Sequence, residues 1–162
     1  MYPSEDYNKH ISSIKNAENI HTPLEHYKTI NEKLEGKTHE KTGVLFVRKE
    51  IDISGKTYSL VVPEFESCYD ATISLELYLK RDKVQFKECN RQLLEAVGDN
   101  IELRKIFSEK QLNQISKGKN PKGYTWHHDA ESGKLQLVDK EIHKRTGHTG
   151  GRAIWGGGSK YR

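Results

Sequence analysis

The stretch that most strongly constrains the fold covers residues 123–143 and reads GYTWHHDAESGKLQLVDKEIH. Residues 124–128 are rich in side chains that favour β-strands, and residues 131–134 have the composition of a turn. Residues 135–138 are suited to return antiparallel to the first strand. This half of the stretch therefore predicts a β-hairpin.

The second half of the stretch predicts a short helix. Asp139 is a good N-cap, so a helix should begin there and present His143 one turn in. Gly147 should end it, because glycine readily adopts the left-handed conformation that follows many helices. The predicted unit is a hairpin followed by a helix, with histidines on both parts.

Four of the chain's eight histidines lie close together in the sequence, namely His127, His128, His143 and His148. Neighbouring residues on a strand point to opposite faces, so His127 and His128 reach one cavity only at a bulge or a strand end. His143 and His148 are five residues apart, which places them about 140° apart around an ideal helix. Both bind one ion only if the helix breaks between them, and Gly147 supplies that break. The spacing predicts a metal site built across a helix end.

Three imidazoles form a common ligand set for zinc and similar ions, and they leave a coordination position open for water or phosphate. A fourth histidine outside this ligand set can take a proton from water. The four histidines can therefore supply three ligands of one divalent metal ion, either zinc, nickel or magnesium, and one general base. Two alternatives use the same residues: hydrogen-bonded core histidines, and a closed structural zinc site made of all four.

The whole chain predicts an α+β fold in three regions. Residues 1–40 are polar and are expected to be helical or a linker, with short helices near residues 7–17 and 24–34. Residues 41–116 are expected to form a supporting α+β region that begins with a β-hairpin. Residues 117–162 are expected to form the unit that holds the metal.

Local patterns place further elements in the supporting region. Ser54-Gly55-Lys56 predicts the turn of the hairpin, and another extended run is expected over residues 73–79. The patterns Asp82-x-x-Gln85 and Ser108-x-x-Gln111 both fit a capping box, in which the side chains of the first and fourth residues bond each other's backbone. Each pattern therefore predicts the start of a helix.

The charge distribution indicates a polyanionic partner. Residues 117–162 contain ten Lys or Arg residues against four acidic ones, a net charge of +6, whereas residues 1–116 carry −2. Such a basic segment is typical of nucleic-acid binding, with a solvated basic tail as the alternative. The candidate contacts to the nucleic-acid backbone are Lys134, Lys144, Arg145 and Arg152, together with Lys117, Lys119 and Lys122.

Composition argues against several other classes of protein. No apolar stretch approaches the roughly 20 residues needed to span a bilayer, so no membrane partner is expected. The first six residues are acidic and polar, unlike a secretory signal peptide. Cys68 and Cys89 are too few for a disulfide framework or a zinc knuckle, and are expected to be free, part-buried thiols.

These motifs resemble the His-Me finger nucleases, also called ββα-metal or HNH/endonuclease VII nucleases, and most closely the bacterial toxin subgroup with a Trp-His-His signature. The resemblance rests on residues 123–128, 135–138, 143 and 148–151, and extends more loosely over residues 86–90 and 111–112. The sequence departs from the pattern in two places. Lys134 stands where many such nucleases have Asn, and the gap between His143 and His148 is five residues where colicin-type nucleases have four.

The resemblance implies that residues 117–162 form a ββα-metal nuclease unit in which His127 and His143 are metal ligands and His128 is the general base that activates the attacking water. His148 is expected to be the third ligand, with a contact to phosphate as the alternative because of the longer gap. It implies hydrolysis of DNA through one divalent ion, with little sequence preference. It also implies a toxin that is secreted, acts in the cytoplasm of a competing bacterium, and is blocked by an immunity protein. An RNase toxin and a non-catalytic, zinc-stabilised nucleic-acid-binding module are the alternatives.

Overall fold

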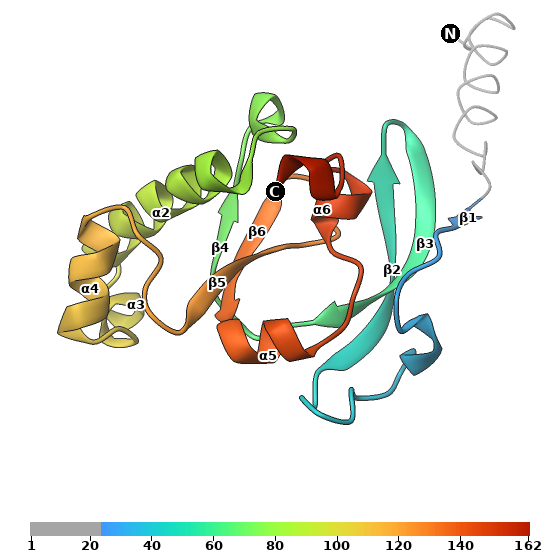
Figure 1. Ribbon diagram of the computed structural model, residues 1–162, viewed down its shortest axis with the longest axis horizontal. Coiled ribbons are helices and arrows are strands. Elements are labelled where there is room, and N and C mark those ends of the chain that lie inside the picture. The colour runs from blue at the N-terminus through green and yellow to red at the C-terminus, as the bar shows by residue number, and fades with distance from the viewer. Residues whose placement is uncertain (1–23) are drawn as a thin grey trace, which may run out of the picture.

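The computed structural model describes residues 24–162, which form two small sheets and several helices (Figure 1). The first sheet has the strand order β1-β3-β2 and consists of β1 (Glu25–His26), β2 (Leu45–Ile53) and β3 (Lys56–Glu64). The second has the order β4-β6-β5 and consists of β4 (Ser67–Thr72), β5 (Tyr124–His128) and β6 (Lys134–Asp139). The α-helices are α2 (Asp82–Asp99), α3 (Ile101–Lys105), α4 (Glu109–Ser116), α5 (Lys140–Arg145) and α6 (Gly151–Ile154). The predicted α+β class is confirmed.

The predicted hairpin of the supporting region is β2 and β3, which pair antiparallel along their whole length. Its turn lies at Ser54 and Gly55, which both have positive φ angles, 51° and 82°. Two successive positive φ angles match the right-handed twist of the flanking strands, which is why such turns join hairpins. The turn lies where the sequence placed it.

The helix predicted over residues 24–34 is wrong. This segment instead contains β1, which runs parallel to β3, and a single 3-10 turn at Glu32–Leu34. The reason is hydrogen bonding to β3: Tyr27 N donates to Ser59 O at 2.9 Å, and Thr29 Oγ1 donates to Val61 O at 2.5 Å. The helix predicted near residues 7–17 lies outside the described residues.

The extended run predicted over residues 73–79 is also wrong, because β4 ends at Thr72 and a 3-10 turn (Leu75–Leu77) follows. The side chain of Gln85 donates from Nε2 to the carbonyl oxygens of Leu77 at 2.8 Å and Tyr78 at 2.9 Å. These backbone acceptors are thus satisfied by a side chain of α2 and need no neighbouring strand.

The main core lies between α2 and the second sheet. Cys89 and Leu93 of α2 pack with Trp126 of β5 and with Leu135 and Leu137 of β6, and all of these side chains are buried. Figure 1 shows α2, α3 and α4 on the side of the second sheet away from the first sheet. Since the core fixes β5 and β6 against α2, it also fixes the end of β5, where His127 and His128 lie.

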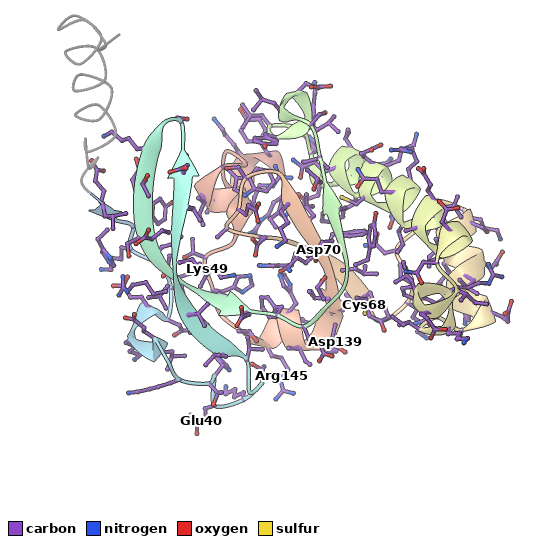
Figure 2. The ribbon with its side chains drawn as sticks, turned by 180° about the vertical axis from the view of Figure 1, so that it is seen from behind. Glu40, Lys49, Cys68, Asp70, Asp139 and Arg145 are labelled. Atoms are coloured by element: carbon purple, nitrogen blue, oxygen red, sulfur yellow. The ribbon has the colours of Figure 1, made fainter. Side chains whose placement is uncertain are left out.

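The second sheet joins two parts of the chain that the sequence analysis separated. β4 comes from the predicted supporting region, and it pairs with β6 of the C-terminal unit. Cys68 lies on β4 (Figure 2), and both Cys68 and Cys89 are free, as expected. Among the described residues, none of the helices has the length and apolar character that crossing a membrane would require.

Candidate metal centre

Three of the predicted histidines meet at the boundary between the two sheets. His127 lies near the end of β5, His143 in α5, and His148 in the segment between α5 and α6. One ring nitrogen from each lies within 4.8 Å of the others, and Nδ1 of His127 is 3.2 Å from Nε2 of His143. This spacing suits three ligands of one ion.

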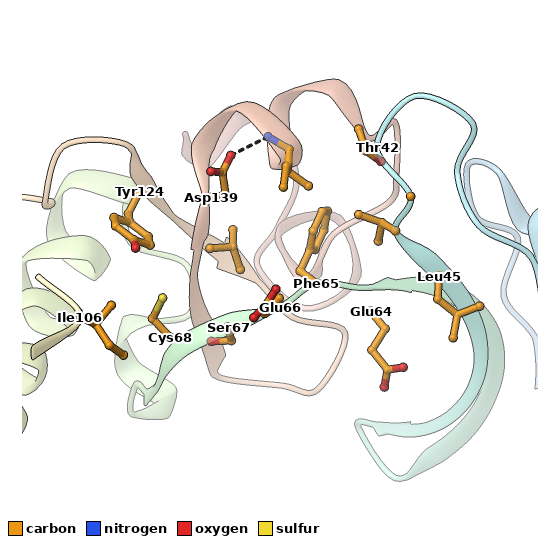
Figure 3. Close-up of a pocket in the computed structure, with 14 residues that line it drawn as sticks. Thr42, Leu45, Glu64, Phe65, Glu66, Ser67, Cys68, Ile106, Tyr124 and Asp139 are labelled. Carbon is orange, nitrogen blue, oxygen red and sulfur yellow. Dashed lines mark hydrogen bonds between the residues drawn. The ribbon is translucent and has the colours of Figure 1, made fainter. Parts of the chain in front are cut away.

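Helix α5 begins and ends in a way that brings its histidine toward the sheet. Asp139 caps it by accepting a hydrogen bond from Ile142 N at 2.8 Å, the dashed line in Figure 3. The helix ends at Arg145, and Thr146 is extended (φ −97°, ψ 98°). The break therefore occurs one residue before Gly147, the residue expected to cause it. Thr146 is held there because its hydroxyl donates to Ile142 O at 2.7 Å.

The ring of His148 is oriented by a backbone carbonyl. Its Nδ1 lies 2.6 Å from Thr146 O, an acceptor, so Nδ1 carries the proton and Nε2 is left with a lone pair. Such a bond to the far ring nitrogen is the usual way that proteins orient a histidine ligand. Gly150 keeps the adjacent space open: a Cβ there would lie 3.6 Å from His148 Nε2. The ring of His148 is therefore held in place by its surroundings.

Phe65 forms an apolar wall behind the three imidazoles. Its ring centroid lies 4.7 Å from that of His127, 5.3 Å from that of His143 and 5.1 Å from that of His148. Phe65 also lines a separate cavity of about 780 Å³, and none of these histidines lines that cavity (Figure 3). The ring thus separates the histidine cluster from that cavity. Sequence analysis did not single out Phe65, because nothing local marks a lone aromatic residue between two strands.

His128 points into a different environment from His127. Its Nε2 lies 2.7 Å from Oε1 of Gln85 and 3.7 Å from Oδ1 of Asp82. Because Nε2 of Gln85 already donates to two backbone carbonyls, its oxygen must face His128, and an amide oxygen only accepts. His128 therefore carries its proton on Nε2 and keeps the lone pair on Nδ1.

Arg152 completes the surroundings of His128 and is buried, with 3% of its surface exposed. It donates from Nη2 to Asp82 and, at 2.6 Å, to Gln85 Oε1, while Nη1 donates to three backbone carbonyls. A guanidinium engaged in this way belongs to the wall of the site, unlike the exposed side chain of Lys144. The role of Arg152 toward phosphate stays a prediction.

Asp82 and Gln85 are functional candidates that the sequence analysis missed. Their Asp-x-x-Gln pattern predicted a capping box, and α2 does begin there. The N-cap of α2 is Arg81, however, without a side-chain hydrogen bond, and both predicted capping residues turn toward the histidines. The capping box of α4, between Ser108 and Gln111, is present as predicted.

Burial keeps the four imidazoles uncharged. Desolvation is the largest cause in each case: it lowers the pKa of His127 well below its usual value, that of His128 and His143 to about 4, and that of His148 as well. The neighbouring charge of Arg152 lowers the pKa of His128 further, and Asp82 opposes it. Neutral imidazole is the form that binds a metal or accepts a proton.

The end of β5 lets the two environments share one cavity. His127, His128, His143 and His148 all line a hollow of about 280 Å³, together with Phe86, Arg152 and Arg162. Strand alternation sends the two neighbouring imidazoles to different partners, and the hollow opens where the strand stops. The arrangement can place a metal ion and a proton acceptor on two sides of one bound group.

The remaining predicted nucleic-acid contacts lie in varied settings. Lys144 and Arg145 are exposed in the last turn of α5. Lys134 is part-buried and lies 3.6 Å from carboxylate oxygens of Asp70 and Glu131, so acidic groups already accompany its charge. The other candidate lysines, at positions 117, 119 and 122, are exposed between α4 and β5.

Comparison with known proteins identifies one matching family. The model of the DNase/tRNase domain of colicin-like bacteriocins matches residues 55–150, which is more than half of the chain. The matched region contains the four histidines of the candidate centre as well as Phe65, Asp82 and Gln85. Neither the curated proteins nor the solved structures include a significant match.

Proposed function

The chain belongs to the family of DNase/tRNase domains of colicin-like bacteriocins and is thus a nuclease toxin domain, and we propose that it hydrolyses DNA with one divalent metal ion and with His128 as general base. The observation that carries this proposal is the meeting of three ligand nitrogens within 4.8 Å, in the same cavity as a fourth, differently held imidazole. In this proposal β5, β6 and α5 form the ββα-metal unit of a His-Me finger nuclease.

The residues present fit a metal ion. His127, His143 and His148 supply neutral nitrogen donors, and His148 is oriented by Thr146 as ligands usually are. Three imidazoles favour zinc or nickel by affinity, whereas magnesium generally prefers oxygen donors. A bound divalent ion would neutralise charge on the phosphate and stabilise the leaving oxygen.

The chain's own groups perform the proton transfer in this mechanism. Nδ1 of His128 accepts a proton from the attacking water, while Gln85 Oε1 holds the proton on Nε2 and so fixes the ring. Asp82, 3.7 Å from the same ring nitrogen, offsets the positive charge that the imidazole gains. Arg162 lines the cavity and Lys144 and Arg145 lie on the adjoining helix, where they contact the phosphate backbone without reading its sequence.

The test of this proposal compares His128→Ala with the wild-type chain on plasmid DNA and on total RNA, under magnesium, nickel and zinc. We expect His128→Ala to bind metal and DNA but to cleave about 10²- to 10⁴-fold more slowly, the usual contribution of a general base. His26→Ala is the matched control, because His26 is exposed and does not line the histidine cavity. Unchanged cleavage by His128→Ala would refute the assigned base.

The same experiment separates the alternatives. Cleavage of RNA with intact DNA would replace DNA by RNA as the substrate. A zinc-stabilised binding module would show stoichiometric zinc, loss of the fold on chelation and no strand cleavage under any metal.

The proposed biological role is that of a secreted toxin that acts in the cytoplasm of a competing bacterium and is held in check by an immunity protein. Its support is the bacteriocin family and the +6 charge of residues 117–162, which suits an acidic inhibitor. Expression of the wild-type chain inside bacterial cells should stop growth, and His128→Ala should relieve the arrest. Equal growth arrest by both chains would contradict a toxicity that depends on cleavage.

A further inference from the structure

A second cavity, of about 420 Å³, adjoins the metal centre and is rich in lysine. It lies between the first half of α2 and the loop that joins α4 to β5. We call it the lysine groove. The side chains that line it include Lys83, Phe86, Lys87, Asn90, Lys117 and Lys119.

Phe86 connects the lysine groove to the metal centre. Its side chain lines both cavities, and its ring centroid is 5.8 Å from that of His128. A chain-like ligand with one group at the histidines can therefore continue across Phe86 into the groove without leaving the protein surface.

The positive charge of the lysine groove is not neutralised by the protein. Lys83 and Lys87 are one helical turn apart, a spacing at which like charges repel and destabilise a helix. Within residues 24–162, none of the four lysines of the groove forms an ion pair. The nearest acids along α2, Asp82 and Glu88, are instead engaged by arginines. The groove thus keeps a positive potential that a polyanion can use.

The loop side of the groove is held in place by a buried amide. Asn90, which is 2% exposed, donates from Nδ2 to Gly118 O at 3.2 Å and to Asn120 Oδ1 at 2.8 Å. Its Oδ1 accepts from Trp126 Nε1 at 2.9 Å. One side chain therefore links α2, the lysine-bearing loop and β5. The part of the loop next to Lys117 and Lys119 is therefore held in place before any ligand arrives, which lowers the entropic cost of binding.

We propose that the lysine groove binds the phosphates of the substrate strand that flank the scissile bond, and that the strand passes over Phe86 between the two sites. The inference rests on the proposed nuclease function and adds the direction in which the substrate leaves the metal centre. Lysine contacts of this kind give affinity that depends on salt and not on sequence.

The test measures binding apart from cleavage. Lys83, Lys87, Lys117 and Lys119 are all changed to Gln in a His128→Ala background, and the affinity for a short DNA duplex is measured by fluorescence anisotropy between about 50 and 200 mM salt. The slope of log K against log salt should become shallower by about 0.9 for each phosphate that the variant no longer neutralises, and by about 2 to 4 for the whole groove.

The matched control removes the same charge elsewhere. Four exposed lysines near the first sheet, Lys28, Lys33, Lys37 and Lys41, are changed to Gln in the same background. This control should keep a slope close to that of the parent. Since all eight lysines are exposed, both variants should fold, and their melting temperatures check this. Equal slopes in the groove variant and the control would overturn the inference.

Failure of the groove proposal and failure of the nuclease proposal give different results. A chain that cleaves DNA while its groove variant binds like the control would refute only the groove. A chain that cleaves nothing while the groove variant still loses its salt dependence would refute only the nuclease mechanism.

Discussion

Replacement of Gln85 by Met should disable the proposed base while leaving the metal ligands intact. Gln85 is fully buried, and its amide makes four hydrogen bonds, to His128, Arg152 and the carbonyls of Leu77 and Tyr78. Methionine has a similar length and flexible shape but offers none of these bonds. The variant therefore removes the group that fixes the proton on Nε2 of His128.

The expected magnitudes follow from this network. Loss of four buried hydrogen bonds at about 1 kcal/mol each lowers the free energy of unfolding by at least about 4 kcal/mol, because some of the buried partners are left unsatisfied. A domain of ordinary stability, about 5–15 kcal/mol, remains folded after that loss, although a small one is weakened severely. A base whose ring is no longer fixed should lower kcat by about 10²-fold, near the lower end of what general-base catalysis contributes. Metal affinity should not change, because Gln85 contacts none of His127, His143 or His148 in the described structure.

The assay is single-turnover cleavage of DNA at saturating metal, with metal affinity measured by titration calorimetry and the histidine tautomer by nitrogen NMR. Wild-type His128 should show a proton on Nε2, and Gln85→Met should show a mixture of tautomers. Gln92→Met is the matched control: Gln92 lies on the same helix and also donates to a backbone carbonyl, Thr72 O at 2.8 Å, but does not contact His128. A folded Gln85→Met chain with wild-type kcat, or one that loses activity only in proportion to metal affinity, would refute the reasoning.

Two further predictions concern stability. A Cβ at Gly151 would overlap the carbonyl oxygen of Asp129, so Gly151→Ala should lower the free energy of unfolding by about 3 kcal/mol. Gly150→Ala is the control: its nearest new contact is 3.3 Å, and it should cost less than about 1 kcal/mol. Chemical denaturation that gives the opposite order would contradict the placement of α6. In the metal-free chain the pKa values of His128 and His143 are about 4 in the folded state and near 6.5 in the unfolded state. The unfolded state therefore binds more protons, and the free energy of unfolding should fall as the pH drops from 6.5 to about 4. Denaturation curves recorded with a chelator at several pH values check this, and a free energy of unfolding that does not change with pH would contradict it.

The parts of the fold that could be predicted from sequence are those set by neighbouring residues. The turn at Ser54 and Gly55 and the Asp139 cap are decided within a few positions, and both lie where local patterns placed them. The same patterns led to the grouping of His127 with His143, which the structure brings to 3.2 Å. Their role as ligands remains a prediction.

The parts that were missed depend on partners far away in the sequence. Residues 24–34 contain no α-helix because β3, about thirty residues on, supplies hydrogen bonds to Tyr27 and Thr29. Gln85 lies 43 residues before His128, and Arg152 lies 67 residues after Gln85. A local pattern cannot distinguish a Gln that caps its own helix from one that reaches across the core. The Asp-x-x-Gln pattern therefore predicted the start of the helix but not the contacts of Asp82 and Gln85 with His128.

The alternation of side chains along β5 first argued against a shared site for His127 and His128. It is also the physical basis of their different proposed roles, His127 as a metal ligand and His128 as the general base. One face of β5 places His127 beside His143 and against the apolar ring of Phe65. The other face places His128 against the polar side chain of Gln85. A cation close to His128 would compete with the proton it must accept, so the base works best when the backbone itself holds the two rings apart. The separation is therefore built into the covalent sequence His127-His128, which keeps the proposed metal ligand and the proposed base on opposite faces of one strand.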